Sequence, residues 1–234
     1  MRSGGEMKTK IKLNSIFPSI NGEVSGRGQG SLCTFIRFQG CNLRCSYCDT
    51  KYSQNESGGE EWTIPHIIKV VKSYGLTNIT ITGGEPLLQR EGLIELVEKL
   101  QDAHRQNYIS VCIETNGSLP IPEIWGVVWV VDWKTPSSGM GDKMDLSNFQ
   151  NLSPEDFVKF VIANQKDFDK AVNTIKEINN LSEVLPPRYA FSPVQGKRGT
   201  VQPNKLVEWM TGTKVCRENH SILNLQLHKL IDVL

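Results

Sequence analysis

Short apolar runs alternate with longer amphipathic segments along most of the chain. The apolar runs are rich in β-branched residues and are bounded by turn residues, a pattern typical of buried strands. They predict strands at Lys12–Ile16, Thr34–Phe38, Asn78–Thr82, Tyr108–Ile113, Val127–Asp132, Phe157–Ile162, Arg188–Phe191 and Ile222–Leu227.

The amphipathic segments between these runs predict helices. In one of them Leu93, Val97 and Leu100 recur at helical spacing, which gives an apolar stripe along one face. Alternating strands and helices favour an α/β fold with a mostly parallel sheet and crossover helices, in which ligands bind beyond the carboxyl ends of the strands. The predicted helices lie near Thr63–Tyr74, Pro86–His104, Asp167–Leu181 and Pro203–Gly212.

Length and composition fit one compact domain. The chain has 234 residues, of which 38% are hydrophobic and 22% charged, with a net charge of +1. This balance argues against nucleic-acid and membrane partners and favours a small-molecule ligand. Without an apolar signal core or spanning segment, we expect a cytoplasmic protein. Residues 1–9 are polar and glycine-rich and predict a flexible leader before a domain at 10–234.

Three cysteines stand together directly after the predicted strand Thr34–Phe38. Cys41, Cys45 and Cys48 have the spacing C-x3-C-x2-C. Three thiolates on one loop can hold three corners of a [4Fe–4S] cluster and leave the fourth iron open. A structural zinc site needs a fourth protein ligand, and inert packing fits a polar loop poorly. The scattered cysteines are expected to be small buried hydrophobes, namely Cys33, Cys112 and Cys216.

Polar loops follow the next three predicted strands. Gly83 and Gly84 let the backbone approach a ligand closely, and Glu85 supplies a carboxylate acceptor for an ammonium group. A simple turn is the alternative for each of these loops. The loops have the sequences Thr82-Gly-Gly-Glu-Pro86, Cys112-Ile-Glu-Thr-Asn-Gly117 and Val131-Asp-Trp-Lys-Thr-Pro-Ser-Ser-Gly139.

The cysteine spacing, with an aromatic residue before the third cysteine, resembles the signature of the radical S-adenosylmethionine (SAM) superfamily. The resemblance implies a partial (β/α) barrel in which SAM binds the open iron. Reductive cleavage of SAM then gives a 5′-deoxyadenosyl radical that abstracts hydrogen from the substrate. It also implies SAM contacts from Tyr47, Asp49, Gly83, Gly84, Glu85, Glu114, Asn116, Asp132, Lys134 and Ser137.

Segments outside this signature narrow the resemblance. Ser15–Glu23, Phe35–Phe38, Asp49-Thr50 and Leu223–Lys229 are together similar to the 7-carboxy-7-deazaguanine synthase family, from about Lys10 onward. That family is a carbon–nitrogen lyase that converts 6-carboxy-5,6,7,8-tetrahydropterin into 7-carboxy-7-deazaguanine with loss of ammonia, a step in queuosine-type deazapurine biosynthesis. The resemblance implies SAM as a recycled cofactor and a requirement for Mg²⁺.

The residues make chemical sense for a carboxylated pterin. The carboxylate of Glu23 can accept hydrogen bonds from the pterin edge, and Arg37 can pair with the substrate carboxylate. Thr50 suits Mg²⁺ as a single protein oxygen ligand. The family usually has Gln where Asn21 stands, which weakens a direct side-chain contact there. The implied substrate-binding set is Ile20, Asn21, Gly22, Glu23, Arg37, Thr82 and His228.

Two other functions share part of this pattern. A glycyl-radical-enzyme activase has the same cysteine spacing, but it has no reason to carry the segments around Glu23 and His228. A zinc-stabilised binding module would be non-catalytic and would hold one zinc in place of four irons. The family resemblance further implies a homodimer and a reductase partner such as flavodoxin or ferredoxin.

Overall fold

The computed structural model describes residues 9–104, 108–181, 185–195 and 199–233. The strands of its sheet are β1 (Lys10–Ile20), β2 (Leu32–Phe38), β3 (Glu60–Thr63), β4 (Asn78–Gly83), β5 (Ser110–Thr115), β6 (Val127–Trp133), β7 (Phe157–Ile162), β8 (Arg188–Pro193) and β9 (Ile222–Leu223). The helices are α1 (Ile64–Ser73), α2 (Arg90–Ala103), α3 (Gln165–Leu181), α4 (Pro203–Gly212), α5 (Lys214–Glu218) and α6 (Leu227–Leu230).

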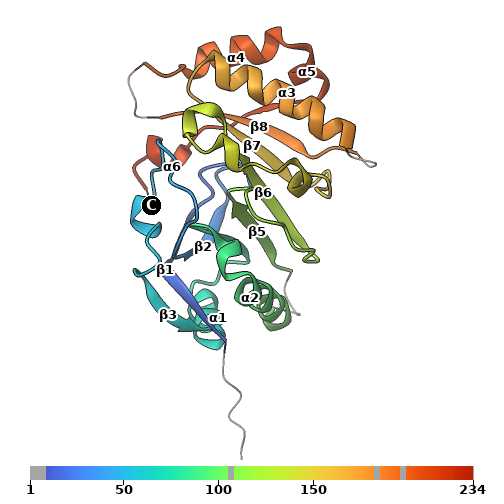
Figure 1. Cartoon of the computed structure of the whole chain (residues 1–234). Helices are drawn as coiled ribbons and strands as arrows, with labels where there is room; N and C mark the ends of the chain where they lie inside the picture. Colours follow the sequence, from blue (N-terminus) through green and yellow to red (C-terminus); the bar gives the residue numbers. More distant parts are fainter. Residues whose placement is uncertain (1–8, 105–107, 182–184, 196–198, 234) are drawn as a thin grey trace, which may run out of the picture.

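These strands form a single curved sheet in the order β3-β1-β2-β4-β5-β6-β7-β8-β9 (Figure 1). The pairs β1–β2 and β1–β3 are antiparallel, and every pair from β2–β4 to β8–β9 is parallel. The sheet is open between β3 and β9, so it is a partial barrel. The predicted fold class is confirmed.

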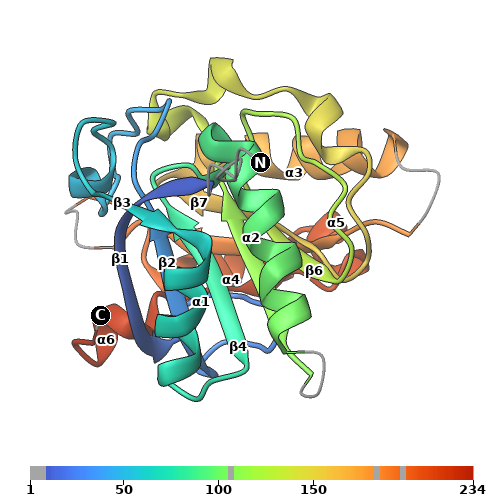
Figure 2. The same cartoon turned by 90° about the horizontal axis from the view of Figure 1, so that it is seen from below.

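The outer face of the sheet carries the main hydrophobic core. Ile81 of β4, Ile113 of β5 and Phe160 of β7 are fully buried in this core together with apolar residues of the helices. Helices α1 and α2 cover one half of the sheet, and α3 covers the other half with α4 and α5 (Figures 1 and 2). The amphipathic patterns in the sequence therefore supply the cover of this outer face.

The inner face carries two successive layers of side chains, because alternate residues of a strand point to the same side. The first layer is a small separate hydrophobic cluster, which we call the apolar layer; it consists of Val24, Cys112, Val130, Phe157 and Ala190. Two residues further along the parallel strands stands a second set, which we call the polar layer; it consists of Thr82, Glu114, Asp132, Lys159 and Ser192.

Several predicted boundaries differ from the structure. The expected strand Ile222–Leu227 ends at Leu223, because Asn224 and Gln226 turn their side chains inward to bind Glu23, and Leu227 begins α6. Helix Pro86–His104 is two elements: a 3₁₀ turn at Pro86–Gln89 and then α2. Sequence patterning missed β3 and α5, as well as three 3₁₀ turns at Pro136–Ser138, Gly141–Lys143 and Leu146–Phe149.

The glycine-rich stretch Gly22–Gly30 is held by hydrogen bonds. The Asn21 amide donates to the Ser31 carbonyl at 2.8 Å, and the Gly30 amide donates to the Asn21 carbonyl at 2.7 Å. The Gln29 side chain donates to the Gly22 carbonyl at 2.8 Å. This fixed loop places Glu23 and Val24 inside the barrel.

Of the expected leader, residues 1–8 lie outside the described residues. Across the described ranges, no helix combines the length and the apolar character that a bilayer crossing requires.

Candidate active site

A cavity that is partly open to solvent lies at the carboxyl ends of the parallel strands. All five residues of the polar layer line it, and so do the three clustered cysteines. The cavity therefore stands where the parallel-sheet rule predicts a ligand.

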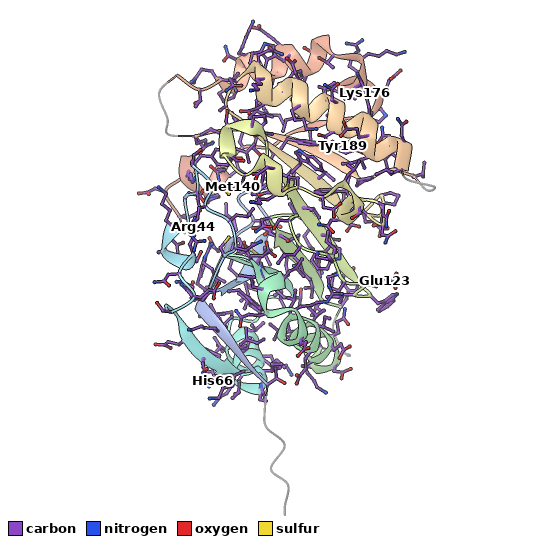
Figure 3. The ribbon with its side chains drawn as sticks, in the orientation of Figure 1. Arg44, His66, Glu123, Met140, Lys176 and Tyr189 are labelled. Carbon is purple, nitrogen blue, oxygen red and sulfur yellow. The ribbon has the colours of Figure 1, made fainter. Side chains whose placement is uncertain are left out.

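The cysteine loop is fixed at its base by backbone hydrogen bonds. The Gly40 amide donates to the Ser53 carbonyl at 2.8 Å, and the Cys41 amide donates to the Gln54 carbonyl at 3.1 Å. Arg44 closes the loop by donating to the Cys41 carbonyl at 2.6 Å. The Arg44 backbone amide donates to the Met140 sulfur at 3.5 Å, and Figure 3 shows both residues on the same side of the molecule.

Three sulfurs are the donor set that this loop offers. Cys41, Cys45 and Cys48 are free thiols on the cavity wall, whereas the other cysteines are buried elsewhere and do not line it. This set fits a [4Fe–4S] cluster with one open iron and falls short of the four ligands of a structural zinc. Within the described ranges, no three Cys, His, Asp or Glu side chains are grouped as for a single metal ion.

Burial raises the pKa of the Cys41 and Cys45 thiols. The protonated thiol is the form that burial favours, and a metal ligand must be the thiolate. Binding of a cluster must therefore release these protons.

The glycine pair at the end of β4, Gly83 and Gly84, allows the cysteine loop to pack against the sheet. Gly83 has φ +144°, and a Cβ there would lie 2.3 Å from the Phe38 carbonyl oxygen. A Cβ on Gly84 would lie 2.0 Å from the Gly40 carbonyl oxygen. Both glycines line the cavity. Their small size is thus required by the protein backbone itself, in addition to any ligand.

Glu85, expected to bind the SAM amine, lies behind the cavity wall. It is fully buried and accepts hydrogen bonds from the Leu87 amide at 2.9 Å, the Thr115 hydroxyl at 2.8 Å and the Asn116 amide at 2.7 Å. Both of its oxygens are used within the protein, and burial raises the pKa of this carboxyl. Glu85 therefore connects two strand-end loops, and the structure does not place it as a ligand contact.

Asn21 and Ser137 also lie outside the cavity lining. The Asn21 side chain donates to the Ser31 hydroxyl at 3.0 Å and accepts from the Thr80 hydroxyl at 2.6 Å, so it is a buried loop anchor. The Ser137 hydroxyl accepts from Asn164 at 2.9 Å. In each case, the polar group that was expected to contact a ligand forms a hydrogen bond with a residue that is distant in the sequence.

The remaining predicted site residues all reach the cavity wall, although they come from seven separate stretches of the chain. Besides the cysteines, they are Ile20, Gly22, Glu23, Arg37, Tyr47, Asp49, Thr50, Thr82, Gly83, Gly84, Glu114, Asn116, Asp132, Lys134 and His228.

Opposite charges alternate across the floor of the cavity. Lys134 Nζ lies 2.7 Å from Asp132 Oδ2, and Lys159 Nζ lies 2.5 Å from Glu23 Oε2. Burial opposes the charge on Asp132, but the two lysines outweigh it and lower the pKa of this carboxyl. Glu114 accepts from the Thr82 hydroxyl at 2.7 Å, and burial raises its pKa.

Comparison with known proteins agrees with this geometry. Residues 35–127 match the model of the radical SAM superfamily. A 7-carboxy-7-deazaguanine synthase of Clostridium acetobutylicum is 38% identical over 227 residues, which cover 94% of this chain and 95% of the relative. The chain belongs to the 7-carboxy-7-deazaguanine synthase family.

Another relative with the same name and the fold agree with this assignment. The 7-carboxy-7-deazaguanine synthase of Chlorobaculum tepidum is 36% identical, with 96% of each chain covered. The crystal structure of QueE from Escherichia coli is 18% identical and covers 92% of this chain and 93% of its own, with a TM-score of 0.69; this likeness supports the fold. As a radical SAM enzyme, this family member uses a [4Fe–4S] cluster and SAM.

Arg37 is the cation of this synthase-family site that lacks an acidic partner in the described part of the chain. Its guanidinium lies over the rings of Phe17 and Tyr52, with 5.8 and 5.9 Å to the ring centroids. Two aromatic faces thus hold an arginine at the cavity wall with its hydrogen-bond donors available.

Sequence reasoning missed several charged or polar residues of the wall, among them Lys159, Gln226 and Lys229. Lys159 lies between two carboxylates of the floor. Gln226 donates to Glu23 at 2.8 Å, and Lys229 donates to Asp49 at 2.5 Å. The signal for Lys159 was present, because it is the charged residue in the apolar strand Phe157–Ile162. Gln226 lies within the predicted strand Ile222–Leu227, and Lys229 follows that strand.

Proposed function

We propose that this chain converts 6-carboxy-5,6,7,8-tetrahydropterin into 7-carboxy-7-deazaguanine, with loss of ammonia, as a radical SAM lyase. The observation that carries the proposal is its 38% identity to a 7-carboxy-7-deazaguanine synthase over 94% of this chain and 95% of the relative. The cavity supports it, because its lining combines three thiols with the carboxylate of Glu23 and with Arg37, which has no acidic partner among the described residues.

Cys41, Cys45 and Cys48 are the residues that would hold the cluster. When bound, the cluster supplies the electron that cleaves SAM into a radical able to take a hydrogen atom from the substrate. Tyr47, on the cavity wall beside these cysteines, has its hydroxyl buried, and burial raises its pKa to about 12. It therefore offers a neutral aromatic surface to the nucleoside.

Arg37, Glu23 and His228, which all line the cavity, would hold the pterin. Arg37 provides paired N–H donors for the substrate carboxylate. Glu23 provides acceptor oxygens for the N–H groups of the pterin edge, and it forms an ion pair with Lys159. Burial lowers the pKa of His228, so its ring is neutral at pH 7 and can both donate and accept.

Mg²⁺ is also part of the proposal, with Thr50 as its protein ligand. The Thr50 hydroxyl lines the cavity 3.7 Å from the Cys48 sulfur. Mg²⁺ prefers oxygen ligands and keeps several waters, so one hydroxyl and substrate oxygens can complete its shell. We expect Thr50→Ala to keep the iron content of the wild type and to need more Mg²⁺ for half-maximal turnover; an unchanged Mg²⁺ dependence would remove Thr50 from this role.

The proposed enzyme acts in the cytoplasm as a homodimer and receives its electron from a reductase such as flavodoxin or ferredoxin. Sedimentation equilibrium of the reconstituted protein tests the dimer. Turnover with each purified reductase tests the electron donor.

The direct experiment is an anaerobic assay of reconstituted protein with dithionite, SAM, Mg²⁺ and the carboxylated tetrahydropterin. We expect a deazapurine product identified by its absorbance and mass, with SAM present in catalytic amount. SAM cleavage without pterin conversion would assign another substrate. One zinc per chain in place of about four irons would contradict the enzyme altogether. The glycyl-radical activase alternative is not favoured by the named relatives.

A further inference from the structure

Lys159 lies at the centre of the polar layer, and family resemblance gave it no role. Its side chain rises from β7, is 10% exposed and lines the cavity. Its Nζ lies 2.5 Å from Glu23 Oε2 and 3.3 Å from Asp132 Oδ1. One ammonium group therefore contacts both a carboxylate proposed for the pterin and a carboxylate proposed for SAM.

The surroundings keep this lysine charged. Burial alone would lower the pKa of Lys159, but the carboxylates of Asp132, Glu23 and Glu114 outweigh it and raise the pKa well above the ordinary value. Buried charges are retained in proteins only when they are paired in this way. Lys159 is thus a permanent cation among three acids.

Its two acidic partners differ in what else they contact. Asp132 has a second cation, because Lys134 Nζ lies 2.7 Å from its other oxygen. Among the described residues, the other donors to Glu23 are neutral amides, from Asn224 at 3.2 Å and Gln226 at 2.8 Å. In the described part of the chain, Lys159 is the one cation paired with Glu23.

We propose that Lys159 is a positioning residue that pairs with the Glu23 carboxylate and holds it oriented toward the N–H donors of the pterin ring. The inference rests on the proposed function, because it concerns the substrate side of that same site. Loss of Lys159 leaves Glu23 beside Glu114 without a counter-ion, whereas Asp132 keeps Lys134. The substrate should therefore lose affinity while SAM does not.

The test is a double-mutant cycle on the reconstituted enzyme, with Lys159→Met, Glu23→Gln and the double variant. Calorimetry gives the Kd of SAM, and then that of the pterin with SAM bound; turnover gives KM and kcat. We expect Lys159→Met to raise the pterin Kd and KM about tenfold or more, since it strips a buried carboxylate of its partner. The SAM Kd and kcat should change less than about threefold.

In the Glu23→Gln background, Lys159→Met should add less than about threefold to the pterin Kd, because its effect passes through Glu23. Lys159→Arg keeps the charge and should retain most of the affinity. Lys205→Met is the matched control: its Nζ also lies 2.5 Å from a carboxylate, Glu208, but that pair is exposed on α4. Both affinities should stay at wild-type values in this control.

Wild-type pterin affinity in Lys159→Met would overturn the inference. An equal loss in the Glu23→Gln background would also overturn it, because Lys159 would then bind the substrate itself. If Lys159→Met does not fold, Lys159→Gln replaces it. A pterin Kd that is raised in Lys159→Gln but not in Lys159→Arg supports the inference, and equal pterin Kd values in the two variants contradict it. Wild type that binds the pterin without converting it contradicts the proposed reaction alone, and the binding cycle still decides Lys159.

Discussion

Phe157 and Lys159 stand two residues apart on β7 and face the same interior, yet one belongs to a hydrophobic cluster and the other to an ion-pair network. The same change occurs between Val130 and Asp132 on β6. The backbone is equally regular at both levels, so the side chain alone decides the character of each layer. The apolar layer fills the interior with packed side chains, and the polar layer above it lines the cavity.

The difference teaches how stability and chemistry are separated within one strand. Apolar side chains in the lower layer contribute by being removed from water. Charges in the upper layer are tolerated only because each has a partner, and their net contribution to stability is small. Substitutions in the two layers should therefore affect different measurements.

The largest contrast is expected between Cys45, on the cavity wall, and Cys112, in the apolar layer. Cys45→Ala removes a proposed cluster ligand and should abolish cluster assembly and turnover, as shown by iron and sulfide analysis of the anaerobically reconstituted protein. Cys112→Ala removes a buried thiol from the apolar layer. This variant should retain cluster assembly and turnover, at a cost of about 1 kcal/mol in the free energy of unfolding. Equal iron loss in both variants would contradict the separation.

A large loss of stability without a loss of catalysis is expected for Phe157→Ala. This change empties a buried aromatic site in the apolar layer and should lower the free energy of unfolding by about 3–5 kcal/mol. Urea unfolding measures the loss, and kcat/KM per iron-loaded molecule should remain near the wild-type value. A collapse of kcat/KM in well-folded protein would show that the two layers are coupled.

A smaller pair of changes compares Thr82 with Thr80, successive inward residues of β4. Thr82→Val leaves Glu114 without its hydroxyl donor and should lower kcat/KM about tenfold. Thr80→Val removes the hydrogen bond to Asn21 and should cost about 1 kcal/mol of stability while kcat/KM stays near wild type. If Thr80→Val also impaired catalysis, Asn21 would act at the site after all.

The smallest effect concerns His228 at the outer edge of the polar layer. Burial lowers its pKa in the folded protein, so at mildly acidic pH the unfolded chain binds a proton that the folded chain does not. The free energy of unfolding should therefore fall as the pH is lowered from above the ordinary histidine value of about 6.5 toward the folded pKa. His228→Asn should reduce this slope in urea titrations between pH 8 and 6; an identical slope would place the linkage elsewhere.

Much of the scaffold was predictable because it depends on local patterns. The parallel strands follow from β-branched runs, and the cysteine triplet stands at the end of one of them. The side-chain directions of Glu85 and Asn21 were not predictable, because their partners, Asn116 and Thr80, are distant in sequence. A polar residue beside a motif can face a ligand or brace a loop, and only tertiary contacts distinguish the two.

Lys159 illustrates the opposite case, in which a local signal existed and was not used. A lone charge within an apolar strand such as Phe157–Ile162 must be paired if it is buried. Asp132 gives the same signal in Val127–Trp133, and the structure brings the two together at 3.3 Å. Opposite lone charges on neighbouring parallel strands are thus a sequence signature worth searching for.

The short final strand has a consequence for how such a site can diversify. After Leu223 the wall is built from amide and ammonium side chains that bind Glu23 and Asp49. Main-chain hydrogen bonds from Asn224 to Phe191 and from Leu227 to Gly22 anchor this segment. Because this part of the wall consists mainly of individual side chains, single substitutions in it do not require a change in the register of paired strands. Ligand preference in this architecture can therefore drift at residues 224–229 while the catalytic loops stay in place.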